Sequence, residues 1–197
     1  GVSRFRVNVF RQRGSLAAII RVITFDLPDF HNLNIPQVVI DISRMTKGFV
    51  LVTGPAGSGK STTLACIIDQ INKTRNAHVI TLEDPIEYLH RHNQSVVTQR
   101  EIGLDTESYV TGLRAALRQA PDVILVGEMR DEETIKTALT AAETGHLVIS
   151  TLHTVGAANT IDRIIDSFPP AQQEQVRAQL SMVMQAVVSQ QLIPKVE

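Results

Sequence analysis

The arrangement of apolar positions changes once along the chain, near residue 48. Before this point, residues 4–10 alternate polar and apolar side chains with a period of two, which predicts a half-buried strand. The side chains expected to face a core are Phe5, Val7 and Val9. Gly14 lies in a turn signal, and residues 15–23 predict a second strand antiparallel to the first. We therefore expect a small β appendage over residues 1–23.

A polar stretch over residues 24–37 follows this appendage. It contains Pro28 and Pro36, and a short helix is expected after Pro36 because proline suits the first helical position. We interpret residues 24–37 as a linker, which leaves residues 38–197 as the main domain.

From residue 49 onward, short apolar runs alternate with longer segments of helical period. This alternation is typical of βαβ units that form a parallel sheet. Strands are expected at 49–53, 77–82, 122–126 and 147–151, with a further short strand near 96–99. Helices are expected at 60–72, 106–119, 131–144, 156–167 and 171–190. Apolar residues recur at helical spacing in the last helix at Val176, Leu180, Val183 and Val187. The sequence therefore predicts an α/β fold.

Composition and charge exclude several classes of protein. The 197 residues are 43% hydrophobic, and 19 Lys and Arg against 20 Asp and Glu give a net charge of -1. This balance leaves no global basic field to recruit nucleic acid or anionic lipid. The apolar runs are shorter than the roughly 20 residues that span a bilayer, and no signal peptide is recognised.

The single cysteine and the first residue add two expectations. Cys66 lies among apolar residues and is expected to be buried rather than reactive. One cysteine forms neither a disulfide nor a CxxC zinc site, which fits a reducing cytoplasm. The chain opens on Gly1 without Met, so we expect a fragment of a longer protein.

The most specific motif spans residues 54–61, which match G-x-x-x-x-G-K-[ST] after an apolar strand and before a helix. Glycines let backbone N–H groups turn inward, and the helix N-terminus adds positive potential, so a phosphate site is predicted. Lys60 is expected to reach the β- and γ-phosphates, and Ser61 to bind Mg²⁺. The expected nucleotide-binding residues are Gly54, Pro55, Ala56, Gly57, Ser58, Gly59, Lys60, Ser61 and Thr62.

Three other predicted strands end in polar groups. Because the carboxyl ends of parallel strands meet at one edge, Glu83, Glu128 and His153 are expected beside the phosphates. Glu128 has the position of a Walker B acid and is expected to orient and deprotonate the attacking water, although an exposed loop acid is the alternative. The usual preceding Asp is Gly127 here, so metal binding would depend on Ser61, phosphate oxygens and water.

Glu83 forms an acidic cluster with Asp84 and Glu87. Because Glu83 lies directly at the strand end, we expect it to hold a metal-bound water or to orient the attacking water. A solvated turn is the alternative for this cluster. His153 is expected to donate to the γ-phosphate, whereas His146 begins the same strand at its opposite end and is not expected to reach it.

Three arginines, Arg100, Arg114 and Arg118, are candidates for neutralising charge at the γ-phosphate. Arg114 and Arg118 lie four residues apart opposite an apolar stripe, and a solvated basic face is an equally good interpretation. His90 and His92 lie in a polar turn and are expected to be exposed.

Four ordered segments resemble motifs of the secretion ATPase superfamily, and most closely those of type IV pilus retraction (twitching motility) ATPases, the PilT-like group. They are residues 54–63 for Walker A, 80–88 for the Asp box, 124–131 for an atypical Walker B with Gly in place of Asp, and 144–154 for the His box. By this resemblance Glu128 is the catalytic glutamate, Glu83 its Asp-box partner and His153 a γ-phosphate contact. The resemblance also implies that Arg100 and Arg114 reach a neighbouring subunit's nucleotide.

The resemblance implies a homo-hexameric ring whose subunits carry an N-terminal PAS-like domain and a RecA-like P-loop ATPase core. Residues 1–23 would then be the end of the PAS-like domain, and residues 38–197 the ATPase domain, truncated at its C-terminal end. The implied activity is hydrolysis of ATP with Mg²⁺, which drives pilus retraction. The implied location is the cytoplasmic face of the inner membrane, where membrane contact is made through partners such as the pilus platform protein.

Other functions remain open from the sequence. Pilus extension and type II secretion ATPases usually carry a four-cysteine zinc insertion, which this chain lacks, so retraction is favoured over extension. A regulator that binds ATP without hydrolysing it is a second class, and Glu128 beside an intact P-loop argues against it. A P-loop kinase is a third, for which no acceptor-site lid is found.

Overall fold

The computed structural model describes residues 4–23 and 27–194. The first part of the predicted linker, residues 24–26, lies outside them. The strands are β1 Arg4–Gln12, β2 Ser15–Ile23, β3 Gly48–Thr53, β4 His78–Glu83, β5 Val96–Glu101, β6 Val123–Val126, β7 Leu147–Leu152 and β8 Met184–Ser189. The helices are α1 Gln37–Ile40, the 3-10 helix η1 Asp41–Arg44, α2 Lys60–Thr74, α3 Tyr109–Ala116, α4 Glu132–Glu143, α5 Ala157–Ile165 and α6 Pro170–Val183.

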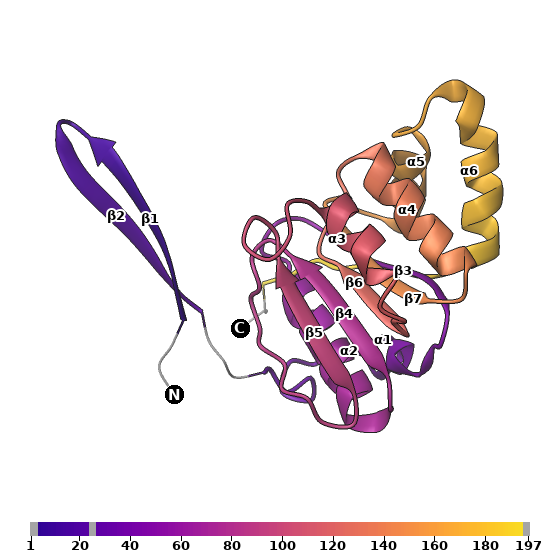
Figure 1. The fold of residues 1–197 in the computed structure, drawn as a ribbon, viewed down its shortest axis with the longest axis horizontal. Helices are drawn as coiled ribbons and strands as arrows, with labels where there is room; N and C mark the ends of the chain where they lie inside the picture. The colour runs from indigo at the N-terminus through magenta and orange to yellow at the C-terminus, as the bar shows by residue number, and fades with distance from the viewer. Residues whose placement is uncertain (1–3, 24–26, 195–197) are drawn as a thin grey trace.

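Six strands form one sheet in the order β5-β4-β6-β7-β3-β8 (Figure 1). Every adjacent pair in this sheet is parallel, so all six strands end at the same edge. β3 and β6 are buried along their whole length, as expected for strands covered on both faces. The α/β fold with a parallel sheet is confirmed.

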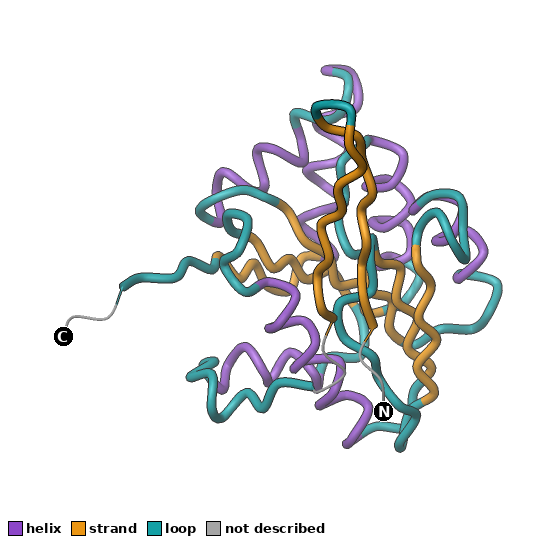
Figure 2. Tube along the Cα trace, turned by 90° about the vertical axis from the view of Figure 1, so that its left-hand side faces the viewer, coloured by secondary structure: helices purple, strands orange, loops and turns teal. Residues whose placement is uncertain are grey.

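Helices cover both faces of this sheet, as the view in Figure 2 shows. One core joins apolar residues of α1, η1 and α2 to one face, with Ile67 and Ile71 of α2 fully buried. The other core joins α3, α4, α5 and α6 to the opposite face, with Leu113 and Leu139 fully buried. Residues that alternate along a strand therefore contact different helices.

β1 and β2 form a separate two-stranded antiparallel sheet, drawn in indigo in Figure 1. Its strands and turn follow the prediction. The expectation that its apolar side chains face a core is wrong within the described residues, because Phe5 and Val7 are each 53% exposed and Val9 is 63% exposed. A two-stranded hairpin has too little surface to form a core by itself.

The predicted helix over residues 171–190 is also corrected by the structure. α6 ends at Val183, and Met184–Ser189 form β8, which pairs with β3 at the sheet edge. Val187 belongs to the core under α4 and α6, whereas Val188 belongs to the core under α2. The helical spacing of Val187 with Val183 was therefore coincidental, since adjacent residues here pack on opposite faces.

The remaining predicted elements are present, with different ends. The short helix after Pro36 is found as α1, and the short strand near residues 96–99 is β5. The helix predicted at 106–119 begins later, because the Ser108 side chain accepts a hydrogen bond from the backbone N–H of Thr111 and caps α3. No helix in the described part of the chain has the length and hydropathy needed to cross a membrane.

Candidate active site

The P-loop connects the buried strand β3 to α2. Gly54, Gly57 and Gly59 adopt φ angles of +144°, +77° and +88°, which L side chains rarely adopt. Gly54 also has no space for a side chain, because a Cβ there would collide with the carbonyl oxygen of Gln190. The loop conformation therefore depends on glycine at these positions.

Lys60 begins α2 and turns back over the loop. Its Nζ donates to the carbonyl oxygens of Gly54 and Pro55, each at 2.9 Å, and lies 3.5 Å from Nδ1 of His153. Burial lowers the pKa of Lys60, while the nearby carboxylates of Glu128 and Glu87 oppose this effect. The ammonium group is thus held by neutral carbonyls, which a phosphate oxygen can replace with a stronger, charge-assisted partner.

The structure brings the predicted residues of four strand ends together. A pocket of about 320 Å³ opens between the P-loop and the ends of β4, β6 and β7. Its lining includes Lys60, Ser61, Glu83, Asp84, Glu87, Tyr109, Gly127, Glu128, Arg130 and His153. Acidic, basic and imidazole groups therefore surround the same cavity, as the strand order predicts.

Glu128 lies close to two basic groups of this pocket, Arg130 and His153. Its side chain is 14% exposed, and Oε1 lies 2.8 Å from Nη2 of Arg130. Oε2 lies 3.7 Å from Nε2 of His153. One carboxylate oxygen is therefore paired with an arginine while the other faces the imidazole side of the pocket, where a water molecule would be oriented.

Glu83 lies at the end of β4, and side chains on the same face of the sheet hold its carboxylate by hydrogen bonds. Its Oε1 accepts hydrogen bonds from Oγ1 of Thr81 at 2.7 Å and from Nε2 of Gln99 at 3.2 Å. Burial raises the pKa of Glu83, and these hydrogen bonds partly offset the increase. The carboxylate has a fixed orientation and a greater tendency to take up a proton than an exposed acid.

Gly127 stands where a Walker B motif usually has Asp, and the structure gives a steric reason. A Cβ at this position would lie 3.0 Å from the carbonyl oxygen of Leu82 and 3.1 Å from the hydroxyl of Tyr109. Tyr109 begins α3 and lines the pocket, and burial raises the pKa of its hydroxyl. The Tyr109 hydroxyl and the end of β4 therefore occupy the space that a side chain at residue 127 would need.

These residues fit a magnesium nucleotide. Gly59 is the N-cap residue of α2, and no side chain of the described residues caps the helix there. The first N–H groups of α2 therefore remain available to an anion. The Oγ atom of Ser58 is buried and has no hydrogen-bond partner among the residues that the structure describes. Ser61 is exposed at the pocket and, with Glu83, would hold Mg²⁺, which when bound would neutralise charge on the β- and γ-phosphate oxygens.

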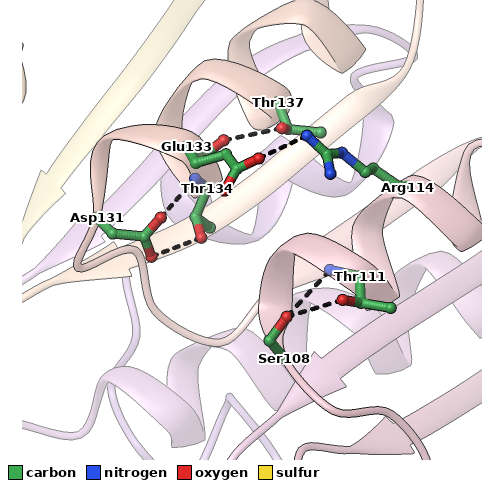
Figure 3. A network of polar contacts seen from close by, with 7 residues as sticks. All are labelled: Ser108, Thr111, Arg114, Asp131, Glu133, Thr134 and Thr137. Carbon is green, nitrogen blue, oxygen red and sulfur yellow. Dashed lines mark hydrogen bonds and ion pairs between the residues drawn. The ribbon is translucent and has the colours of Figure 1, made fainter.

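None of the three candidate arginines, Arg100, Arg114 and Arg118, lines this pocket. Nη2 of Arg114 forms a 2.6 Å ion pair with Oε1 of Glu133 on the surface between α3 and α4 (Figure 3). Nη2 of Arg100 donates to the carbonyl oxygen of Asp105 at 2.7 Å. Within one subunit these guanidinium groups bind local partners, which leaves their role toward a neighbour's nucleotide a prediction.

The other histidines and the cysteine differ in how well they were predicted. His90 was expected to be exposed, and this is wrong: its Nδ1 is buried without a partner in the described structure, and burial lowers its pKa to about 4. His92 is exposed, as predicted. His146 Nδ1 lies 2.9 Å from the carbonyl oxygen of Ala141 at the far end of β7, away from the pocket. Cys66 is buried, as predicted, and burial raises its pKa to about 11, which keeps the thiol protonated near neutral pH.

Comparison with known proteins agrees with this geometry. The family model described as type II/IV secretion system protein matches residues 20–197. The chain belongs to this family. Its sequence is 52% identical over 196 residues to the "Type IV pilus retractation ATPase PilT" of Pseudomonas aeruginosa, and the match covers 100% of this chain and 57% of the relative. It is 53% identical over 192 residues to the "Twitching motility protein" of Neisseria gonorrhoeae, which covers 98% of this chain and 51% of the relative.

A solved structure of a member of the same family shares the fold. The crystal structure of the pilus retraction motor PilT with bound ADP superposes with a TM-score of 0.96 at 58% sequence identity. The match covers 100% of this chain and 57% of the solved one. The chain thus spans little more than half the length of these relatives. The resemblance to the PilT-like group is confirmed.

Several residues at the site were not identified from the sequence. Arg130 lies two residues after Glu128, and this spacing within the Walker B segment was the available signal. Tyr109 gave no signal, because its position over Gly127 depends on how α3 packs. Gln99 was not singled out from the sequence, where only its neighbour Arg100 was a candidate. Its contact with Glu83 depends on the pairing of β4 with β5.

Proposed function

We propose that this protein hydrolyses ATP to ADP and phosphate and uses the energy for mechanical work in pilus retraction. The observation that supports the hydrolysis most strongly is the single pocket that combines Lys60 and Ser61 of the P-loop with Glu83, Glu128 and His153. A site that only bound nucleotide would not require two carboxylates beside the γ-phosphate position. The 52% identical relative named as a retraction ATPase supports the mechanical role.

Each residue would have one task during hydrolysis. The P-loop N–H groups and Lys60 would bind the β- and γ-phosphates and stabilise charge that develops on the γ-phosphate oxygens. Glu128 would accept a proton from the attacking water, with Arg130 and His153 holding the carboxylate in position. Glu83 would help to hold Mg²⁺ through a water at the same edge, because its own hydrogen bonds fix its direction.

The assembly proposed for this motor is a homo-hexameric ring at the cytoplasmic face of the inner membrane, acting on pilus machinery through protein partners. Residues 1–23 would complete an N-terminal PAS-like domain, and residues 24–37 would link it to a RecA-like ATPase domain. The apolar residues exposed on the hairpin, among them Val7 and Ile20, support a role as part of a larger sheet.

The test is a pair of substitutions assayed with Mg-ATP. Glu128→Gln keeps the shape of the side chain but not its basicity, so ATP binding should stay near normal while hydrolysis slows by a factor on the order of 10² to 10⁴. Lys60→Ala is the comparison variant and should lose nucleotide binding itself. Nucleotide binding that collapses in Glu128→Gln, while turnover per bound ATP survives, would make Glu128 a metal ligand and contradict its proposed role.

A further inference from the structure

The edge strand β5 presents different side chains to the two faces of the sheet. Gln99 pairs in register with Thr81, and Arg100 pairs with Leu82. Because side chains alternate along a strand, Gln99 shares a face with Thr81 and Glu83, while Arg100 lies on the other. The face of Gln99 is the one covered by α2, whereas Leu82 packs in the core with α3 and α4.

The amide group of Gln99 connects three points of the chain. Its Nε2 donates to Oε1 of Glu83 at 3.2 Å and to the carbonyl oxygen of Tyr88 at 2.8 Å. Its Oε1 accepts from the backbone N–H of His90 at 2.8 Å. Both amide hydrogens and the carbonyl oxygen are therefore used, and this fixes the orientation of the side chain.

The backbone held in this way belongs to the loop at residues 84–90, which forms one wall of the pocket. Asp84 and Glu87 of this loop line the cavity. The hydroxyl of Tyr88 lies 3.1 Å from Oγ1 of Thr62, in the first turn of α2. Tyr88 therefore contacts the P-loop helix through its hydroxyl and Gln99 through its carbonyl oxygen.

We propose that Gln99 is a positioning residue of the active site, which holds the Glu83 carboxylate in place both directly and through the loop at residues 84–90, whose Glu87 backbone also bonds to Glu83. This inference rests on the proposed function, because it assumes that Glu83 takes part in hydrolysis. A carboxylate with a fixed orientation needs less reorganisation when the transition state forms. Loss of the Gln99 amide would leave the Glu83 carboxylate with the Thr81 hydroxyl and the backbone N–H of Glu87, and would free the backbone N–H of His90.

Gln99→Met tests the idea, since it keeps the length of the side chain and removes its hydrogen bonds. We expect kcat to fall on the order of 10-fold, as for other residues that orient a functional ligand. In a Glu83→Gln background the same substitution should change kcat less than about twofold, because Gln99 acts through Glu83. The matched control is Thr98→Val on the same edge strand, whose hydroxyl contacts His78 rather than the pocket, and it should leave kcat within about twofold of wild type.

Hydrogen exchange gives a second readout that requires no turnover. The backbone N–H of His90 should exchange about fivefold faster in Gln99→Met, because its acceptor is gone. Additive effects of Glu83→Gln and Gln99→Met on kcat would overturn the proposal, and so would unchanged exchange at His90. Failure of the proposed function is a separate outcome, since it would appear as absence of ATP hydrolysis in the wild type.

Gln99→Glu keeps the test decisive if the methionine variant fails to fold. It has nearly the same shape and retains an acceptor for His90, but it places a carboxylate against Glu83. If Gln99 has a positioning role, Gln99→Glu should lower kcat more than a well-folded substitution of Gln99 by a neutral residue does. The reason is that the introduced carboxylate repels the carboxylate of Glu83. A Gln99→Glu protein with wild-type kcat would contradict the proposal.

Discussion

Gly127→Ala probes the packing that explains the missing Walker B aspartate. The added Cβ would lie 3.0 Å from the carbonyl oxygen of Leu82, 3.1 Å from the hydroxyl of Tyr109 and 3.3 Å from Cα of Glu83. Two of these neighbours are backbone atoms, and the Leu82 oxygen is fixed further because it accepts from the N–H of Gly127 at 2.7 Å. The contacts therefore cannot relax through rotation of a side chain alone.

The cost follows from these contacts. Gly127 is not among the described residues with positive φ, so alanine adds no backbone strain there. Overpacking costs about 1–3 kcal/mol, and stiffening of the unfolded chain offsets about 0.4–1 kcal/mol of it. A net loss of about 1–2 kcal/mol lowers Tm by roughly 2–8 °C in a domain of this size.

Thermal unfolding followed by circular dichroism measures this effect. Tyr109→Phe removes one of the three contacts. Gly127→Ala should therefore lower Tm less when it is introduced into Tyr109→Phe than when it is introduced into the wild type. The contacts with Leu82 and Glu83 remain, so recovery should be incomplete. A Gly127→Ala protein as stable as wild type, or more stable, would refute the steric explanation of this glycine.

Two other predictions concern pH and assembly. The pKa of His90 is about 4 in the folded state and 6.5 in the unfolded state. The unfolded state therefore binds more protons below pH 6.5. The free energy of unfolding should consequently fall by about 3 kcal/mol between pH 7 and pH 4. Urea titrations should show a smaller fall in His90→Gln; an equal fall would contradict this assignment. Arg114→Ala and Glu128→Gln subunits should each be nearly inactive alone, yet regain part of the ATPase activity when mixed, because an arginine acting in trans is supplied by the neighbour. No recovery in verified mixed rings would argue against a role for Arg114 in trans.

The sequence predicts the parts of the fold that depend on local pattern. The strands β3, β4, β6 and β7 are short, largely apolar segments, and each appears within a residue or two of its predicted range. β8 was missed because Val183 and Val187 match a helical period by chance, while edge pairing with β3 decides the structure. The core expected on the hairpin could not be judged from alternation, which shows amphipathicity but not what covers the apolar face.

The candidate site divides in the same way. Lys60 was predicted from the P-loop motif. Glu83, Glu128 and His153 were predicted because each lies at or near the end of a strand, and parallel topology brings strand ends together. Burial of His90 was not predictable, since it depends on how the loop at residues 84–90 folds over the sheet rather than on local polarity. Residues that act through others require knowledge of register, which a single sequence does not contain.

The position of β5 at the edge of the sheet has a consequence for a ring motor. On one face, Gln99 contacts Glu83 of the subunit's own pocket. The next residue, Arg100, lies on the opposite face, where Asp105 holds it through its carbonyl oxygen and accepts the N–H of Glu101 through its carboxylate. If Arg100 reaches the nucleotide of a neighbouring subunit, any displacement of β5 moves Gln99 at the subunit's own site and Arg100 at the neighbour's site at the same time. Adjacent sites in the proposed ring would then be coupled through one strand, and this coupling needs no separate signalling element.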